Sequence, residues 1–139
     1  MDNKVVVICG PTGIGKTSFA IKLATLFNGE IVNADSMQIY RYMDIGTAKP
    51  TLEEQAQAKH HMIDMVDPDQ EFDAGMYASK ATAVISELKQ NNRVPIIAGG
   101  TGLYVKALLY GLFRSRPLDE AIMNRLEAEL EQHGAPFLH

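Results

Sequence analysis

Eight residues near the start of the chain match the pattern G-x-x-x-x-G-K-[ST] of a phosphate-binding loop: Gly10, Pro11, Thr12, Gly13, Ile14, Gly15, Lys16 and Thr17. Glycine lets backbone N–H groups turn inward, and the start of the following helix offers unpaired donors and a positive dipole end. Lys16 adds a positive charge, and Thr17 adds a hydroxyl for Mg²⁺. The pattern predicts a phosphate site; the alternative is a glycine-rich turn with a solvated Lys16.

Two further segments carry groups that suit the same chemistry. Asp35 begins the run DSMQIY, where a carboxylate could hold Mg²⁺ or accept a proton from a nucleophile. The alternative for Asp35 is that it caps a helical turn, a place that Asp favours. Thr101 lies in the glycine-rich run AGGTG and could donate to a phosphate or a base, or cap the next helix. The strand before Thr101 lacks the acidic residue that would mark an ATP-driven motor.

These segments follow predicted strands. Apolar runs predict strands over residues 4–9, 30–33 and 94–98, with a weaker strand or extended segment over 62–66. Periodicity and end signals predict helices from the phosphate loop to Asn28, over 51–59 and 74–91, after Gly102, and from Pro117 to Gly134. Thr51 and Glu54 have the spacing of a capping box at the start of the second of these helices. Their expected apolar faces carry Phe19, Leu23, Leu26 and Phe27 in the first helix, Tyr77, Ala81, Val84, Ile85 and Leu88 in the third, Val105, Leu108, Leu109 and Leu112 in the fourth, and Leu118, Ile122, Leu126 and Leu130 in the last. Residues 34–50 read as a functional loop.

Alternating strands and helices predict an α/β fold with a mostly parallel sheet flanked by helices. Ligands of such sheets bind at the carboxyl ends of the strands, where the phosphate loop, Asp35 and the second glycine turn all lie. The first strand is expected to be buried on both faces, with Cys9 as a small core residue. Pro95 cannot donate a ladder hydrogen bond and is expected at the start of its strand or on an edge.

Composition excludes several classes of protein. The 139 residues are 46% hydrophobic and 22% charged, which is typical of a globular domain. A net charge of −4 argues against non-specific coating of nucleic acid, and Cys9, the only cysteine, permits no internal disulfide. No apolar run is long enough for a membrane span and no signal peptide is recognisable, so we expect a cytoplasmic protein without a membrane partner.

Other polar residues give weaker signals. His60 and His61 lie near Asp64 and Asp67, but the spacing fits no established zinc pattern, so structural histidines are favoured over metal ligands. Five basic residues could gather at the mouth of the crevice, although a solvated surface is the default: Arg41, Lys49, Arg114, Arg116 and Arg125.

The motifs together resemble one family. GPTGIGKT, NADSMQIYRYMDIGTAKPT, HHMIDMVDP and PIIAGGTGLYVKALLYGL are similar to the tRNA dimethylallyltransferases over about residues 4–113. The resemblance implies a phosphate-loop NTPase-like (kinase-like) fold and transfer of a dimethylallyl group from dimethylallyl diphosphate to N6 of adenosine 37 in tRNA, with release of pyrophosphate and assistance by Mg²⁺. It also implies that a full-length family member is a monomer.

The resemblance assigns roles to matching residues. Gly10 to Thr17 would cradle the diphosphate, with Thr17 on Mg²⁺ and Asp35 as a possible second metal contact. Asp35 would accept the proton of the adenine amine, and Thr101 would lie near the reacting centre. The tRNA contacts would come from Asp35, Ser36, Met37, Gln38 and Thr101, with the target base turned out of its stack.

Length separates this chain from the family, whose members are expected to be roughly twice as long at about 100–200 residues per domain. We expect residues 1–114 to be the N-terminal part of an α/β core with an incomplete sheet, and 115–139 to begin a helical insertion. Such a fragment would expose an edge of its first strand and be catalytically incomplete. It would self-associate, be marginally stable, or borrow a strand from a partner. The rival interpretations are a small-molecule kinase of the phosphate-loop type and a non-catalytic phosphate-binding module.

Overall fold

The computed structural model describes residues 4–112 and 120–134. Its four strands are β1 (Val6–Cys9), β2 (Gly29–Asn33), β3 (His60–His61) and β4 (Val94–Gly99). Its helices are α1 (Lys16–Leu26), α2 (Leu52–Gln57), α3 (Ala74–Gln90), α4 (Gly102–Tyr110) and α5 (Glu120–His133). Among the described residues, no helix is long and apolar enough to cross a bilayer.

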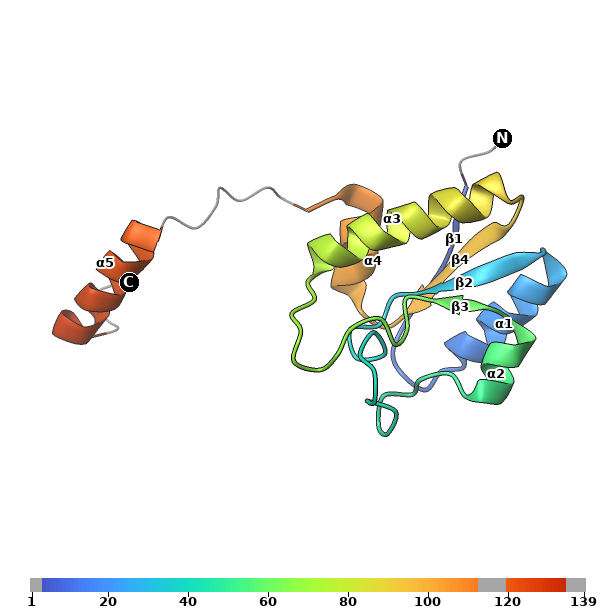
Figure 1. Ribbon diagram of the computed structural model, residues 1–139, viewed down its shortest axis with the longest axis horizontal. Coiled ribbons are helices and arrows are strands. Elements are labelled where there is room, and N and C mark those ends of the chain that lie inside the picture. The colour runs from blue at the N-terminus through green and yellow to red at the C-terminus, as the bar shows by residue number, and fades with distance from the viewer. Residues whose placement is uncertain (1–3, 113–119, 135–139) are drawn as a thin grey trace.

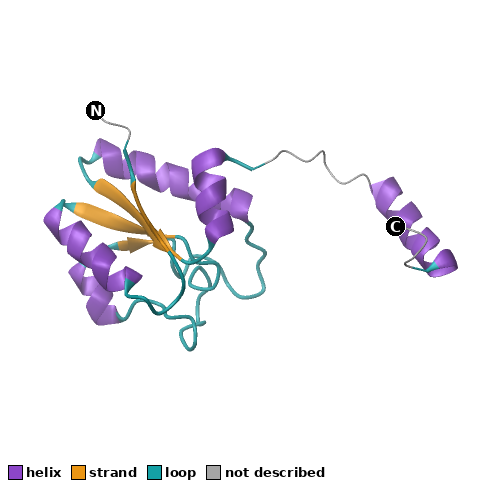
Figure 2. Cartoon of the chain, turned by 180° about the vertical axis from the view of Figure 1, so that it is seen from behind, coloured by secondary structure: helices purple, strands orange, loops and turns teal. Residues whose placement is uncertain are grey.

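All strand pairs in the sheet are parallel, in the order β1-β4-β2-β3. Helices α1 and α2 lie on one side of the sheet, and α3 and α4 cover the other (Figures 1 and 2). The register places Cys9 opposite Gly99, and Asn33 opposite Ala98. The carboxyl ends of β1, β4 and β2 therefore lie at the same edge of the sheet, as the alternation of strands and helices predicts.

Each face of the sheet has its own apolar cluster. Val32 and Ile97 pack with Tyr77 of α3 and Tyr104 of α4. Ile31 and Ile96, which point to the opposite face, pack against α1. The ring of Tyr77 stacks on that of Tyr104 with centroids 4.4 Å apart. In each central strand, β2 and β4, one of these two neighbouring residues therefore packs into one apolar cluster and the other residue into the opposite cluster.

The burial of α1 contradicts its expected apolar face. Phe19, Leu26 and Phe27 are exposed, and Leu23 is only partly buried. The residues that α1 buries are Ala20, Ile21 and Ala24. Two of these three are alanines, whose small side chains let the helix backbone approach the sheet closely. The apolar face expected for the fourth helix is also wrong in part. Helix α4 buries Val105 as expected, together with Tyr104 and Ala107, whereas Leu109 and Leu112 are exposed.

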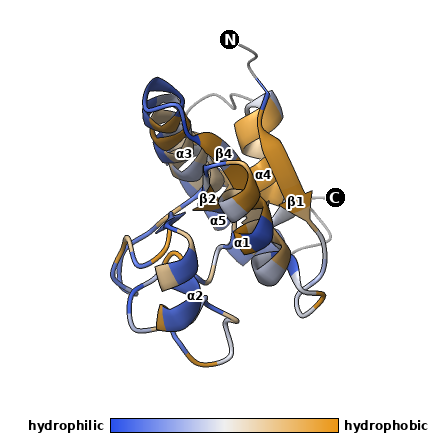
Figure 3. Ribbon diagram, turned by 90° about the vertical axis from the view of Figure 1, so that its right-hand side faces the viewer, coloured by the Kyte–Doolittle hydropathy of each residue, from blue (hydrophilic) through white to orange (hydrophobic). Residues whose placement is uncertain are grey.

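The first strand lies at an edge of the sheet. Among the described residues β1 pairs with β4 alone, so its other edge is open as expected. The expectation of burial on both faces is wrong, because an edge strand has a neighbour on one side only: Val6 is 36% exposed and Cys9 is also exposed. In the view of Figure 3, the apolar colouring of β1 and α4 is conspicuous.

Other boundaries follow local signals. Thr51 and Glu54 form the capping box at the start of α2, but this helix ends at Gln57 and β3 begins at His60. The strand expected over 62–66 is only an isolated bridge between Tyr40 and Val66, because Met62 and Asp64 have positive φ angles, 64° and 50°. Pro95 is the second residue of β4, close to its start as expected.

The long loop and the third helix agree with the sequence. Residues 34–50 contain turns and one bridge but no helix, and α3 buries Tyr77, Ala81 and Leu88. Helix α5 ends before Gly134 as predicted, yet buries none of its residues. Pro117, Leu118, Arg114, Arg116 and the proposed boundary at 114–115 lie outside the described residues.

Candidate functional site

The phosphate loop joins β1 to α1 in a conformation that requires glycine at two positions. Gly13 and Gly15 have φ angles of 85° and 88°, in the left-handed region that glycine adopts without a steric penalty. Gly15 is also the N-cap of α1, and it supplies no side-chain cap for the backbone N–H groups of the first turn. No acidic residue lies in that turn. The start of α1 therefore presents donors and a positive dipole end to an anion.

The loop forms one wall of a hollow of about 270 Å³ at the carboxyl ends of the strands. Asp35, Gln38, Ala48 and Glu54 also line this hollow. The lining residues that the sequence predicted are Thr12, Gly13, Gly15, Lys16, Thr17, Asp35 and Gln38. The hollow thus brings the first two motifs together, as their positions after β1 and β2 predict.

Three lining residues were missed from sequence: Ser18, Ala48 and Glu54. Ser18 follows the loop pattern directly, so its position after Thr17 could have suggested it. Glu54 was recognised only as a capping partner, and its Oε2 does accept from the backbone N–H of Thr51 at 2.8 Å. No local signal marks Ala48.

Lys16 folds back on the phosphate loop, where its ammonium group donates to the backbone carbonyl of Pro11. The second glycine turn lies beside this ammonium group. A Cβ atom placed on Gly100 would be 4.0 Å from Lys16 Nζ and 3.8 Å from Thr12 Oγ1. All three sequence motifs therefore converge, although Gly10, Pro11, Ile14, Ser36, Met37 and Thr101 do not line the hollow itself.

Asp35 caps the turn that follows it. Its Oδ1 accepts from the backbone N–H groups of Met37 at 2.9 Å and Gln38 at 3.3 Å. The capping alternative is thus realised in the structure, and Asp35 is also one of the residues that line the hollow. One carboxylate can combine both roles, because a capping bond to Oδ1 orients the group without closing the hollow.

Gln38 holds the long loop in place through a fully engaged side chain that is 8% exposed. Its Nε2 donates to the carbonyls of Thr47 at 3.0 Å and Ala48 at 2.9 Å. Its Oε1 accepts from Asn33 Nδ2 at 2.7 Å. The structure thus gives Gln38 a place in the wall and a structural task that the sequence did not suggest.

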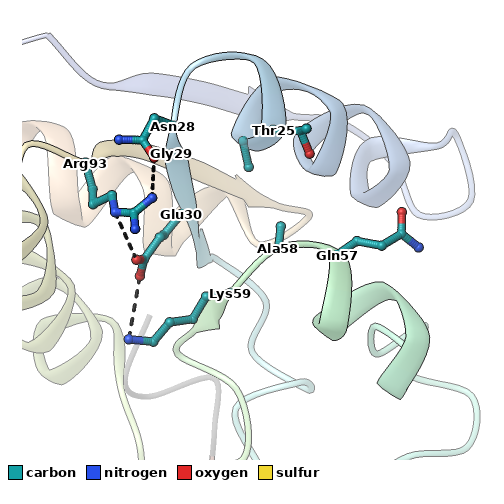
Figure 4. Close-up of a pocket in the computed structure, with 9 residues that line it drawn as sticks. Thr25, Asn28, Gly29, Glu30, Gln57, Ala58, Lys59 and Arg93 are labelled. Atoms are coloured by element: carbon teal, nitrogen blue, oxygen red, sulfur yellow. Dashed lines mark hydrogen bonds and ion pairs between the residues drawn. The ribbon is translucent and has the colours of Figure 1, made fainter.

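A second hollow, of about 310 Å³, lies at the amino ends of β2 and β4 (Figure 4). Glu30 is central to it. Its carboxylate is 2.6 Å from His61 Nε2, 3.6 Å from Lys59 Nζ and 3.8 Å from Arg93 Nε, and Arg93 also donates to the Asn28 side chain. Burial acts to raise the pKa of Glu30, but the hydrogen bond from His61 and the charges of Lys59, His61 and Arg93 outweigh it and lower the pKa.

The two histidines serve the fold. His60 Nδ1 lies 2.8 Å from the carbonyl of Ala58, and burial lowers the pKa of the ring. His61 pairs with Glu30, as described above. Within residues 4–112 and 120–134, no group of three or more His, Cys, Asp or Glu side chains is placed to hold a metal ion.

Comparison with known proteins finds relatives that all carry the name of one kind of transferase. The family described as IPP transferase matches residues 38–139. The tRNA dimethylallyltransferase of Desulfosudis oleivorans is 57% identical over 136 residues, which cover 98% of this chain and 43% of that protein. That of Syntrophobacter fumaroxidans is 52% identical over 139 residues, covering 100% and 41%. The chain thus spans about two fifths of the length of these curated relatives.

Solved structures agree in fold. The full-length tRNA isopentenylpyrophosphate transferase of Bacillus halodurans is 42% identical, with a TM-score of 0.79 over 96% of this chain and 44% of that one. A eukaryotic dimethylallyltransferase described as acting on tRNA is 34% identical, with a TM-score of 0.82 over 91% and 33%. The open parallel sheet is the expected phosphate-loop NTPase-like fold. Sequence, site and architecture agree, and the chain belongs to the IPP transferase family.

Proposed function

We propose that this chain provides the diphosphate-binding and acceptor-activating part of a tRNA dimethylallyltransferase. The donor is dimethylallyl diphosphate, and the acceptor is N6 of adenosine 37 in tRNA. The observation that carries the proposal is the convergence of the phosphate loop and Asp35 on one hollow, with the Gly100 turn beside Lys16 and Thr12 of that hollow. The names of the relatives support the reaction class.

The chemistry is a substitution at the allylic carbon. The bond from this carbon to the diphosphate oxygen breaks, a bond to adenine N6 forms, and pyrophosphate leaves. The loop amides and Lys16 stabilise the charge that develops on the leaving diphosphate, which is the principal electrostatic task of the site. Asp35 takes the proton that N6 loses, since it is a carboxylate residue that lines the same hollow.

Mg²⁺ is the expected metal. Thr17 and Asp35 both line the hollow, and a hydroxyl and a carboxylate are oxygen ligands of the kind that Mg²⁺ accepts. When bound, the ion would add positive charge beside the diphosphate. The role of these residues is to hold it there, directly or through water.

Donor binding tests the first half of the proposal. Calorimetric titration with dimethylallyl diphosphate should show binding that Lys16→Ala weakens by about 2 kcal/mol, the scale of a charge-assisted hydrogen bond. Lys22→Ala is the matched control, because Lys22 is an exposed residue of α1 outside the hollow. An equal affinity of parent and Lys16→Ala would refute the assigned diphosphate site, and tight binding of ATP with poor binding of the prenyl donor would favour a kinase.

Transfer to tRNA tests the second half. In a protein of the relatives' full length that carries this sequence, Asp35→Asn should lower the rate of prenylation by about 10²–10⁴-fold, the usual contribution of a general base. Donor affinity should change far less, because Asn keeps the shape of Asp. Near-parental turnover would leave Asp35 with its capping role alone.

A further inference from the structure

Lys49 is buried in the loop that follows β2, although its side chain carries a full charge. The side chain is 6% exposed. Its ammonium group donates to the Tyr40 carbonyl at 2.9 Å, to Asp44 Oδ1 at 2.7 Å and to Asp64 Oδ1 at 2.6 Å. An ammonium group has three N–H donors, so this one is fully engaged. The expectation of a solvated Lys49 is therefore wrong.

The charge of Lys49 is retained despite its burial. Burial acts to lower the pKa of the lysine, but the hydrogen bonds and charges of Asp44 and Asp64 outweigh it and raise the pKa above its usual value. The ammonium group consequently ties Tyr40 and Asp44, which lie in the same loop as Lys49, to Asp64, which lies after β3. Removing it would leave two carboxylates and one carbonyl without their shared donor.

The loop around Lys49 adopts a strained backbone. Tyr42, Ala48 and Asp64 have φ angles of 65°, 51° and 50°, in the left-handed region that non-glycine residues rarely occupy. Such conformations are unfavourable on their own and persist only where several surrounding contacts hold the backbone in place. Lys49 directly follows Ala48 and bonds Asp64, so its hydrogen bonds are among the contacts that hold this backbone.

The strained segment is also a wall of the candidate site. The Ala48 carbonyl accepts from Gln38 Nε2 at 2.9 Å, and both residues line the hollow with the phosphate loop. The backbone N–H of Gln38 in turn donates to Asp35 Oδ1. A path of hydrogen bonds therefore runs from the Lys49 ammonium group to Asp64, from the Asp64 backbone N–H to the Gln38 carbonyl at 3.2 Å, and from the Gln38 N–H to the proposed base.

We propose that Lys49 is a positioning residue that shapes the acceptor side of the site, where the target purine would face Asp35. Lys49 acts through the Ala48–Gln38 wall and touches neither the donor nor the acceptor. This inference rests on the proposed function, since it assigns a part of that site. It predicts that loss of the ammonium group harms use of tRNA and spares binding of the diphosphate.

The test compares Lys49→Met with Lys59→Met in a protein of the relatives' full length that carries this sequence. Lys59 is 66% exposed, and its ion pair with Glu30 lies at the other end of the sheet. Lys49→Met should lower kcat/KM for unmodified tRNA by about 10–100-fold, since misplacement of about 1 Å can cost 10²-fold. The Kd for pyrophosphate should stay at the parent value, and Lys59→Met should match the parent in both measurements.

A second variant covers the case in which Lys49→Met fails to fold. Asp64→Asn removes one of the two carboxylates that pair with Lys49, and asparagine suits the left-handed backbone at this position because it is enriched in that region. It should lower kcat/KM for tRNA by less than Lys49→Met and leave pyrophosphate binding unchanged.

The outcomes separate this inference from the proposed function. Parental kcat/KM in Lys49→Met, or in Asp64→Asn where the methionine variant does not fold, overturns the positioning role. Equal losses of tRNA use and pyrophosphate binding also overturn it, since they indicate damage to the whole fold. A parent that binds pyrophosphate but never prenylates tRNA refutes the proposed function and the acceptor role with it.

Discussion

The hydroxyl of Thr101 accepts a hydrogen bond from the backbone N–H of Ser36 at 2.9 Å, although 65 positions separate the two residues. The same hydroxyl donates to Ser36 Oγ at 3.2 Å. The backbone N–H of Thr101 donates to the carbonyl of Ala34 at 3.0 Å. Thr101 occupies the N-cap position of α4 without making a side-chain cap, so its hydroxyl serves the Asp35 segment instead.

Replacing Thr101 with valine should loosen the Asp35 segment. Valine keeps the shape of threonine but leaves the Ser36 N–H without its acceptor, at a cost of about 1–3 kcal/mol. Urea denaturation should show the loss in Thr101→Val and not in Thr101→Ser, which keeps the hydroxyl. Equal unfolding midpoints for parent and valine variant would mean that this hydrogen bond adds nothing to stability.

Two adjacent glycines should respond very differently to alanine. A Cβ on Gly99 would lie 2.1 Å from the carbonyl oxygen of Ala34, so β4 and the chain after β2 would have to separate. A Cβ on Gly100 meets its nearest atom, the Gly10 carbonyl oxygen, at 3.5 Å, an ordinary contact. Gly99→Ala should therefore unfold or strongly destabilise the chain, whereas Gly100→Ala should fold. Circular dichroism during thermal unfolding measures both, and a stable Gly99→Ala protein would contradict the close approach.

Removing the hydroxyl of Tyr77 should stabilise the fold. The ring is fully buried, and its hydroxyl has no hydrogen-bond partner among the described residues. An unsatisfied buried polar group costs about 1–3 kcal/mol, and Tyr77→Phe removes this cost while keeping the stack on Tyr104. Chemical denaturation should show a gain of that order. A loss instead would show that the hydroxyl is hydrogen-bonded in solution.

Acid should destabilise the chain in two steps. The folded state lowers the pKa of His60 below its ordinary 6.5 and that of Glu30 below 4.5. The unfolded state therefore binds more protons, and stability falls as the pH drops below about 6.5 and again below about 4.5. Glu30→Gln should remove the lower step, whereas Glu87→Gln, at an exposed position of α3, should keep it. Unfolding free energies measured from pH 8 to pH 3 test this, and a flat profile would contradict both shifts.

The open edge of β1 should make the 139-residue chain self-associate. An unpaired strand edge offers N–H and C=O groups to a second chain, and lysine on an edge strand opposes such pairing. Light scattering over a concentration series should show an increasing mass for the parent and a reduced one for Val6→Lys. Leu52→Lys, an exposed position of α2 away from the edge, should behave like the parent. A parent mass that stays monomeric throughout the series would reject this prediction.

Local signals allowed much of the molecule to be predicted from its sequence. The parallel α/β architecture, the capping box of Thr51 and Glu54 and the termination of α5 before Gly134 are confirmed. Each depends on residues close in sequence, where glycine freedom, capping and hydrophobic period act directly. The convergence of motifs also followed, because parallel strands end at the same edge.

Tertiary structure decided the remainder. The alanine face of α1 depends on how closely the helix approaches the sheet, which its larger apolar residues do not reveal. The exposure of Cys9 follows from the edge position of β1. The bonds from Thr101 to Ser36 and from Lys49 to Asp64 join distant positions. The sequence shows which polar side chains are present but not which group each will bond, because only folding brings the partner within hydrogen-bonding distance.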